Sequence, residues 1–366
     1  MFIDISSSDF RGVFEQELFH LPKRWDGKDF RSSVETLLGN YRRELRHAVG
    51  GTEYDKRQEF EELDDLCNGI VDTIESYFNG YPAKAFKQFS SVMEVLMQHP
   101  LRTYQKTGCG DFFKHRGDPL QLFRVRNVQQ NTITNRSDIF HTPYNLRSKV
   151  ATCRYSIAGY PSLYLGTSLE LCGEESKANS LNELQIASRF ELVRDRRYNS
   201  PSIRVIELAV KPQDFIFERE INYIRNGRIS GRVFDELDLN SSGVKSSYIS
   251  WYPLIAACSF IRVSKADPFA AEYIIPQLLM QWIRNRYERD ELFGVRYFSC
   301  ASARASDLGF NYVFPVSGKR YKTDSQFCDV LAKSFRLTAP KYIHEYQTWA
   351  DCENELLCDA RADCIF

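Results

Sequence analysis

The stretch from Arg154 to Glu175 constrains the fold of this chain most, because it carries the start and stop signals of several elements in one short run. Gly159-Tyr160-Pro161 interrupts the chain directly before the apolar residues 163–165. This order is typical of a turn that leads into a strand. The sequence therefore predicts a turn, then a strand, with a helix directly after it.

The helix is expected to begin where the strand ends. Thr167 and Glu170 have the spacing of a capping box, which would place Glu174 and Glu175 on the second helical turn. Residues four apart share a helix face, so Glu175 lies at the edge of the core-facing side if Leu171 is buried. The pattern predicts a carboxylate that faces a protein-walled space.

The composition excludes several classes of protein. The chain has 366 residues, with 48 Lys and Arg against 48 Asp and Glu. Without an overall positive field, we expect neither nucleic acid nor a membrane to be a partner of this chain. The ten Cys are scattered without a C-x-x-C pair, and no leader or membrane-spanning run stands out. These features predict a cytoplasmic protein with free thiols.

The length and the apolar pattern predict two domains. Apolar residues recur at helical spacing over 61–77 and again over 83–96, so two helices are expected to pack as a hairpin. Residues 107–119 hold three Gly and one Pro without an apolar period, and they mark the boundary. We predict a helical N-terminal domain over residues 1–110 and a second domain, with a C-terminal extension, over 120–366.

The second domain is predicted to be of the α+β class, because its strands and helices do not alternate regularly. Residues 273–275 are expected to form a strand that passes through Pro276 into a helix. In the first strand, Arg124 and Arg126 share one face, since side chains two apart point the same way. The strand that carries these two arginines spans residues 120–128. Further strands are expected over 203–210, 294–299 and 311–316.

A short pattern in the N-terminal domain suggests one possible function. Arg42 and His47 stand with four residues between them, as in metal-independent ribonucleases of the HEPN type. The surrounding segment is highly charged, which is more typical of a solvated helix face. A ribonuclease centred on these two residues stays as an alternative.

Five motifs in order along the chain resemble the RES domain, a family named for an Arg, a Glu and a Ser. They are Leu-Phe-Arg at 122–124, Arg-Tyr-Ser-x-x-Gly-x-Pro at 154–161, Leu-Tyr-Leu-Gly at 163–166, Cys-x-x-Glu at 172–175 and Arg-Tyr-x-Ser at 296–299. The N-terminal helices, with Cys67-x-Gly69-Ile70 and Asn79-Gly80-x-Pro82, look like the HEPN/RES-type helical domain that precedes RES domains in one branch of the family.

The resemblance implies a fold similar to that of ADP-ribosyltransferase toxins, and NAD+ as a consumed substrate rather than a cofactor. Family members hydrolyse or phosphorolyse the nicotinamide–ribose bond or transfer ADP-ribose to a protein, and many are toxins restrained by an antitoxin. We therefore expect an NAD+ glycohydrolase or phosphorylase, a toxin of a toxin–antitoxin or phage-defence system. A protein ADP-ribosyltransferase and a non-enzymatic nucleotide-binding interaction protein remain alternatives.

The resemblance also assigns residues and partners. The implied catalytic residues are Glu175, Arg124, Tyr164 and Ser299, and the implied NAD+-binding residues are Arg154, Arg126, Ser156 and Glu174. Glu174 is the second choice for the catalytic carboxylate, because Glu175 has the expected spacing from Tyr164. No metal is implied, inorganic phosphate is the alternative attacking group, an antitoxin or regulatory protein is the expected partner, and a homo-oligomer is left open.

The chemistry needs groups of these types. Cleavage of the nicotinamide–ribose bond develops positive charge on the sugar, which a carboxylate such as Glu175 stabilises. Guanidinium forks bind the diphosphate of NAD+, the role expected of Arg124 and Arg154. Tyr164 is expected to stack on the nicotinamide ring, and Ser299 to donate a hydrogen bond to a phosphate or ribose oxygen.

The chain departs from this family branch at Gly173, where relatives often carry Trp. Since glycine has no side chain, the wall of the pocket beside Glu175 is expected to be more open.

Overall fold

The chain folds into two compact units. The computed structural model describes residues 11–49, 57–98, 104–105, 121–129, 134–176, 183–192, 204–213, 223–225, 228–230, 242–264, 266–290, 292–316 and 326–365. The first unit draws on Met1–Tyr104, Ile206–Asn222 and Arg232–Asn285. The second draws on Gln105–Val205, Tyr223–Gly231 and Arg286–Phe366.

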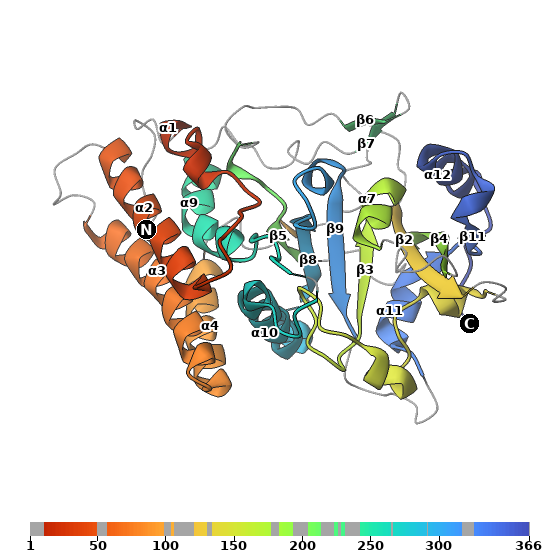
Figure 1. Cartoon of the computed structure of the whole chain (residues 1–366), viewed down its shortest axis with the longest axis horizontal. Coiled ribbons are helices and arrows are strands. Elements are labelled where there is room, and N and C mark those ends of the chain that lie inside the picture. Colours follow the sequence, from red (N-terminus) through yellow and green to blue (C-terminus); the bar gives the residue numbers. More distant parts are fainter. Residues whose placement is uncertain are drawn as a thin grey trace. The chain divides into compact units, whose positions relative to one another are not determined.

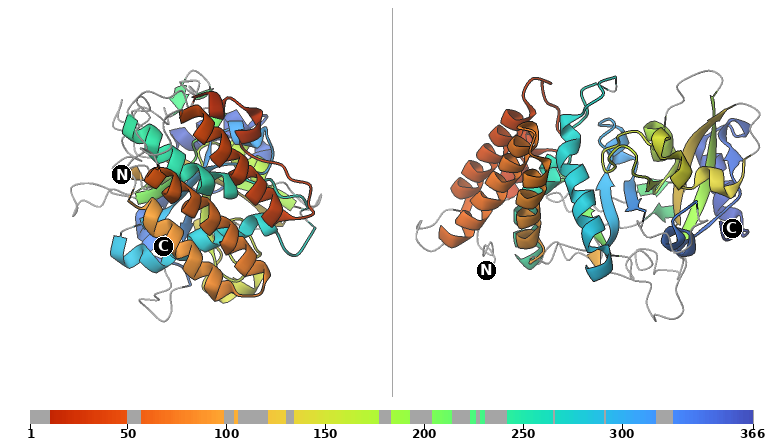
Figure 2. Two further views of the ribbon diagram at one scale, coloured as in Figure 1. Left: turned by 90° about the vertical axis from the view of Figure 1, so that its left-hand side faces the viewer. Right: turned by 90° about the horizontal axis from the view of Figure 1, so that it is seen from below.

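Helices make up most of the first unit (Figure 1). Its elements are α1 (Arg11–Phe14), η1 (Glu17–Phe19), α2 (Phe30–Val49), α3 (Arg57–Phe78), α4 (Pro82–Leu96), α9 (Ser242–Ala257), η4 (Ala271–Tyr273) and the greater part of α10 (Ile274–Asp290). Figure 2 shows α2, α3 and α4 side by side. Gly80, at a φ of 80°, makes the turn before Pro82 at the start of α4, so the predicted helical hairpin is confirmed.

The aromatic residues of the first unit form its core. Phe14, Phe19 and Tyr41 come from the N-terminal segment, and Tyr248 and Tyr252 come from α9. The rings of Tyr41 and Tyr252 lie 4.4 Å apart, and their hydroxyls donate to the main-chain carbonyls of Ile249 and Phe19. Each buried phenol thus has an acceptor, which removes the cost of burying its polar end.

Two later segments of the chain belong to the first unit, although the sequence-based division assigned them to the second domain. α9 is buried almost all round from Tyr248 to Cys258, and it packs against α3. A helix that is apolar on all sides must be enclosed by other elements. The predicted boundary at 107–119 lies outside the described residues.

The expected strand at 273–275 is wrong. Tyr273 ends η4, and Ile274 and Ile275 begin α10. Pro276 lies in the first turn of α10, where its missing N–H costs nothing. The apolar run is the buried face of a helix start, because short apolar runs do not by themselves distinguish a strand from a buried helix.

The second unit contains an antiparallel sheet with the strand order β8-β9-β3-β2-β4-β10. β11 also pairs with β4. The strands are β2 (Gln121–Gln129), β3 (Ser162–Gly166), β4 (Glu183–Leu192), β8 (Leu292–Phe298), β9 (Phe310–Pro315), β10 (Phe335–Leu337) and β11 (Lys341–Tyr342). Figure 1 shows β8, β9 and β3 next to one another.

Short helices complete the second unit. They are α6 (Arg136–Ile139), η3 (Tyr144–Lys149), α7 (Leu169–Glu175), η5 (Ala305–Asp307), α11 (Asp329–Ser334), η6 (Ile343–Glu345) and α12 (Trp349–Cys358), with a separate hairpin of β6 (Tyr223–Arg225) and β7 (Arg228–Ser230). β1 (Tyr104–Gln105) and β5 (Arg204–Leu208) each contain a point where the chain passes between units. The predicted α+β class is confirmed. Among the described residues, no helix is long and apolar enough to cross a membrane.

Candidate active site

The helix α7 lies close against the sheet. A Cβ on Gly166, the last residue of β3, would lie 2.7 Å from the sulfur of Cys172, so only glycine allows this approach. The Cys172 thiol donates to the carbonyl of Phe123 on β2 at 3.3 Å. Ser168 caps the helix by accepting from the N–H of Leu171, so the predicted capping box starting at Thr167 is wrong.

The carboxylate of Glu175 is hydrogen-bonded at the end of α7. Its Oε1 accepts from Ser299 Oγ at 2.5 Å and from Asn311 Nδ2 at 2.9 Å. Ser299 is fully buried and Asn311 is 5% exposed, whereas Glu175 itself is exposed. Ser299 Oγ also accepts from the N–H of Ala301 at 3.1 Å. The hydroxyl proton of Ser299 is therefore directed to Glu175, not to a phosphate or ribose oxygen.

The strand register explains why these groups meet. Gly166 of β3 is directly opposite Asn311 of β9, and Asn311 is directly opposite Tyr297 of β8. Directly paired residues share a face of the sheet. The row therefore places Asn311 and Tyr297 on the same face as Gly166, which is the face that α7 covers.

Tyr297 is buried among several of the predicted site residues. Burial raises the pKa of Tyr297 well above its usual value; the negative charge of Glu175, followed by Tyr164 and Tyr155, raises it further, and Arg154 acts in the opposite direction. The ring of Tyr297 lies 4.6 Å from that of Tyr155. The charges of Glu175, Tyr164 and Arg154 thus all act on one buried phenol.

The hydroxyl of Tyr164 is engaged by the preceding turn. It accepts from the N–H of Tyr155 at 3.2 Å and shares a hydrogen bond with Ser156 Oγ at 2.8 Å. Cys153 and Ser156 close this turn through a pair of main-chain hydrogen bonds. Ser156 therefore contacts Tyr164 and fixes the position of its ring, which is half-buried in β3.

Arg124 of β2 has a buried nitrogen with no hydrogen-bond partner among the described residues, its Nη1. Burial and then the positive charge of Arg126 lower the pKa of Arg124 to about 9, while Cys172, Cys153 and Tyr164 act in the opposite direction. Buried polar groups nearly always have partners, and Arg124 is one of several arginines with such a nitrogen among the described residues, Arg296 with its Nη2 being another. Arg124 lies close enough to Tyr164 for their charges to interact.

Two predicted substrate-binding residues have partners within the protein. Arg126 Nη1 donates to the carbonyl of Asp138 at 2.5 Å. Glu174 forms an ion pair with Arg304 at 4.0 Å, and Arg304 also binds Glu170 at 2.7 Å. Glu174 and Glu175 therefore have different environments, and the structure brings Glu175 rather than Glu174 to Ser299.

The expectation of a more open wall at Gly173 is wrong. A Cβ on Gly173 would lie 2.4 Å from the indole of Trp349, so the ring occupies the space above the glycine. Trp349 is the first residue of α12 and packs against the cluster that includes Leu169 and Cys172 of α7. A tryptophan from elsewhere in the chain thus covers the position of Gly173.

Three residues of this region are not among those predicted from the sequence. Tyr297 lies inside the Arg-Tyr-x-Ser motif, next but one to Ser299, and its position in that motif was the available signal. Asn311 was included only as a strand residue, although a polar amide in an otherwise apolar strand was a sign of a specific contact. No sequence pattern indicates that Trp349 belongs to this region, because it arrives there only through the packing of α12 against α7.

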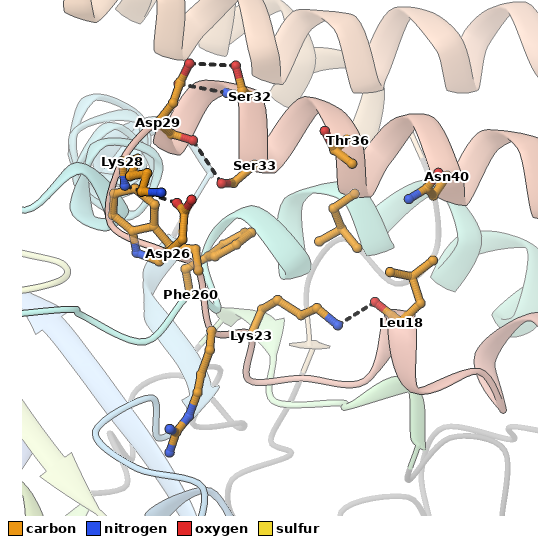
Figure 3. Close-up of a pocket in the computed structure, with 13 residues that line it drawn as sticks. Leu18, Lys23, Asp26, Lys28, Asp29, Ser32, Ser33, Thr36, Asn40 and Phe260 are labelled. Carbon is orange, nitrogen blue, oxygen red and sulfur yellow. Dashed lines mark hydrogen bonds between the residues drawn. The ribbon is translucent and has the colours of Figure 1, made fainter.

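A cavity of about 520 Å³ lies in the first unit, and none of the predicted catalytic residues lines it (Figure 3). Lys23 donates from Nζ to the carbonyls of Leu18 and Glu17, at 2.6 Å and 3.2 Å. Asp29 accepts from the N–H and the hydroxyl of Ser32 at the start of α2. These polar groups hold the segment before α2 in place, and burial lowers the pKa of Lys23 against the opposing effect of Glu17.

Arg42 and His47, the residues of the ribonuclease alternative, both lie on α2. Arg42 Nη1 donates to Asn68 Oδ1 at 2.8 Å and lies 3.7 Å from Asp64 Oδ1 on α3. Five positions on a helix correspond to about 140° of rotation, so the two side chains leave the helix in different directions. The ribonuclease remains a hypothesis that this geometry does not favour.

The chain is similar in sequence to a bacterial protein that is named as a toxin. It is 27% identical over 344 residues to "Putative toxin YopC" of Bacillus subtilis (strain 168), and the alignment covers 91% of this chain and 70% of that protein. The similarity spans both units. No protein-family model matches the chain, and no solved structure matches it significantly. The resemblance to the RES domain therefore stays a prediction.

Proposed function

We propose that this protein is a toxin that degrades NAD+ by cleaving the bond between nicotinamide and ribose. The observation that carries the proposal is the 2.5 Å hydrogen bond between Ser299 and Glu175, which are 124 positions apart and were both expected in one site. The similarity to a protein named as a toxin supports the cellular role. It carries no information about the substrate.

Glu175 has the properties that the bond cleavage needs. The carbon–nitrogen bond breaks with its electron pair leaving on the nicotinamide nitrogen, so nicotinamide departs neutral and positive charge develops on the ribose. A carboxylate beside the sugar stabilises this charge. In hydrolysis, water forms the new bond to ribose and loses its proton to solvent. In phosphorolysis, a phosphate oxygen forms that bond instead.

The two arginines near Tyr164 and Tyr297 suit the diphosphate of NAD+. Arg124 has a buried Nη1 with no acceptor among the described residues, and the charge of Arg154 acts on Tyr297, where it opposes the rise in the pKa of that phenol. Guanidinium groups bind phosphate oxygens through two parallel N–H donors. Arg126 is the candidate ligand for inorganic phosphate in phosphorolysis, and its Nη1 donates to the main-chain carbonyl of Asp138.

The test is nicotinamide release from NAD+ by the purified full-length protein, with and without inorganic phosphate. We expect release by the wild type and a loss of about 100- to 1000-fold in Glu175→Gln, the range for removing a key electrostatic group. Glu170→Gln is the matched control, because it changes another carboxylate of the same helix, one that pairs with Arg304. We expect that variant to retain activity within about twofold.

The products separate the related reactions. Phosphorolysis would be identified by a product that forms only when phosphate is added, ADP-ribose with a phosphate on the ribose carbon that held nicotinamide. ADP-ribosyl transfer would be identified by labelled protein on a gel after incubation with labelled NAD+. Expression of the wild type should arrest growth of the host, and Glu175→Gln should not. Wild-type protein that neither consumes NAD+ nor labels a protein under any of these conditions would overturn the proposal.

A further inference from the structure

The carboxylate of Glu175 is held through one oxygen. Ser299 and Asn311 both donate to Oε1. Among the described residues, no hydrogen bond or ion pair reaches Oε2. Since Glu175 is exposed at the end of α7, Oε2 is the atom of the carboxylate that remains for a ligand.

The two donors differ in how they are fixed. Ser299 has one proton, and because its Oγ accepts from Ala301, that proton is directed to Glu175. Asn311 is fixed by its strand, where it pairs with Gly166 and Tyr297. A Cβ on Gly166 would lie 3.5 Å from Asn311 Oδ1, an ordinary van der Waals contact, so the amide packs beside this position while its Nδ2 reaches Glu175.

We propose that Asn311 is a positioning residue for Glu175, which together with Ser299 fixes Oε1 and presents Oε2 to the ribose of NAD+. The inference rests on the proposed function. Two donors converging on one oxygen restrict rotation of the carboxylate plane, whereas one donor leaves it free to turn. Both donors are neutral, so the negative charge is not cancelled by a cation and remains available to the developing positive charge.

The surroundings of Glu175 support this division of roles. Its charge acts on Cys172 of its own helix and on Tyr297 of β8, two groups whose pKa values are raised chiefly by burial. The nearby cation Arg304 pairs with Glu170 and Glu174. Neutral donors therefore hold Glu175, while its acidic neighbour on α7 has an arginine partner.

The test uses two substitutions of Asn311 in the full-length protein. Asn311→Leu has similar size and no donor, and we expect kcat for nicotinamide release to fall about 10- to 100-fold with KM within about twofold. Asn311→Asp adds a negative charge beside Glu175, which disfavours its ionised form. The acid limb of the pH–rate profile should move upward by about one pH unit.

A direct measurement separates this inference from the proposed function. The titration of the Glu175 carboxyl carbon is followed by NMR in selectively labelled protein, with its signal identified by loss in Glu175→Gln. Asn311→Asp should raise the titration midpoint by about one pH unit. If the wild type does not cleave NAD+ but this shift occurs, the proposed function fails and the contact role of Asn311 stands.

Three results would overturn the inference while the proposed function stands. The first is an unchanged Glu175 titration in Asn311→Asp. The second is wild-type kcat in Asn311→Leu. The third is a rise in KM at constant kcat, which would make Asn311 a substrate-binding residue. A purely structural role would lower the melting temperature and the active fraction without moving the acid limb.

Discussion

Two glutamates, one in each unit, each accept two hydrogen bonds through Oε1 but differ in their exposure to solvent. Glu175 accepts from Ser299 and Asn311 through Oε1. Glu272 of the first unit also accepts twice through Oε1, from the indole N–H of Trp25 at 2.8 Å and the N–H of Val263 at 3.0 Å. Glu272 is 2% exposed, whereas Glu175 is exposed.

The difference separates structural from functional hydrogen bonding. A buried carboxylate such as Glu272 needs donors, because burial without them costs several kcal/mol. Glu175 has access to water, which would solvate it without any protein donor. Its two donors are therefore not required for solvation, and we infer that they serve to place it. Hydrogen bonds to an exposed carboxylate are the more informative sign of a site.

Arg124 gives the largest expected effect and extends the comparison to a cation. Arg124→Met removes a buried guanidinium whose Nη1 has no hydrogen-bond partner among the described residues. We expect nicotinamide release to fall at least about 100-fold, since a phosphate-binding fork is lost. The free energy of unfolding should stay the same or increase, because an incompletely paired buried charge is replaced by an apolar chain of similar length.

Urea denaturation and the nicotinamide assay on the same preparation check this prediction. Arg336→Met is a suitable control, because Arg336 is an exposed residue of the same sheet, on β10. A large loss of stability in Arg124→Met with proportionate loss of activity would instead make Arg124 a structural residue like Glu272.

The sequence was sufficient to predict the local elements of the candidate site. Gly159 and Pro161 indicated the turn before β3, and the polar residues after Leu165 indicated the helix that carries Glu175. These signals act over a few residues, so they are visible in the chain order. The resemblance then linked Glu175 with Ser299, which no local pattern could have done.

The remaining contacts depend on packing between distant segments. Asn311 reaches Glu175 because β3 pairs with β9 in one register, and a register is set by the whole sheet. Trp349 fills the space above Gly173 from a helix far along the chain. The cap fell on Ser168 because Thr167 Oγ1 accepts from the N–H of Phe310 instead. Competing partners of this kind cannot be read from spacing.

Like Glu272, His141 is buried and makes two hydrogen bonds within the protein. Its burial makes the free energy of unfolding depend on pH. Its Nδ1 donates to the carbonyl of Thr142 at 2.9 Å, and its Nε2 accepts from the N–H of Cys328 at 2.8 Å. Burial lowers the pKa of His141 from 6.5 to about 4; the hydrogen bond to Thr142 opposes this, and the charge of Arg124 adds to it. The folded protein therefore holds the neutral ring.

The lowered pKa of His141 determines how the free energy of unfolding changes with pH. As the pH falls below 6.5, the unfolded chain takes up the proton first, so unfolding becomes progressively easier until about pH 4. We expect a loss on the order of 2–3 kcal/mol across this window. Urea midpoints of the wild type and His141→Gln, measured from pH 7 to pH 4, check it. The variant should be less stable at pH 7, and the difference should shrink as the pH falls; a constant difference would contradict the prediction.

The smallest expected effect on stability compares the two glutamates directly. Glu272→Gln keeps an oxygen that can accept from Trp25 and Val263, so we expect it to lower the free energy of unfolding by only about 1 kcal/mol. Nicotinamide release per folded molecule should be unchanged. Glu175→Gln should show the reverse, with stability within about 0.5 kcal/mol of the wild type and activity lost, because exposed substitutions rarely affect stability. Thermal unfolding and the nicotinamide assay on both variants complete the comparison. If Glu175→Gln destabilised the protein as much as Glu272→Gln, the hydrogen bonds of Glu175 would be structural, and exposure would not be the property that distinguishes the two carboxylates.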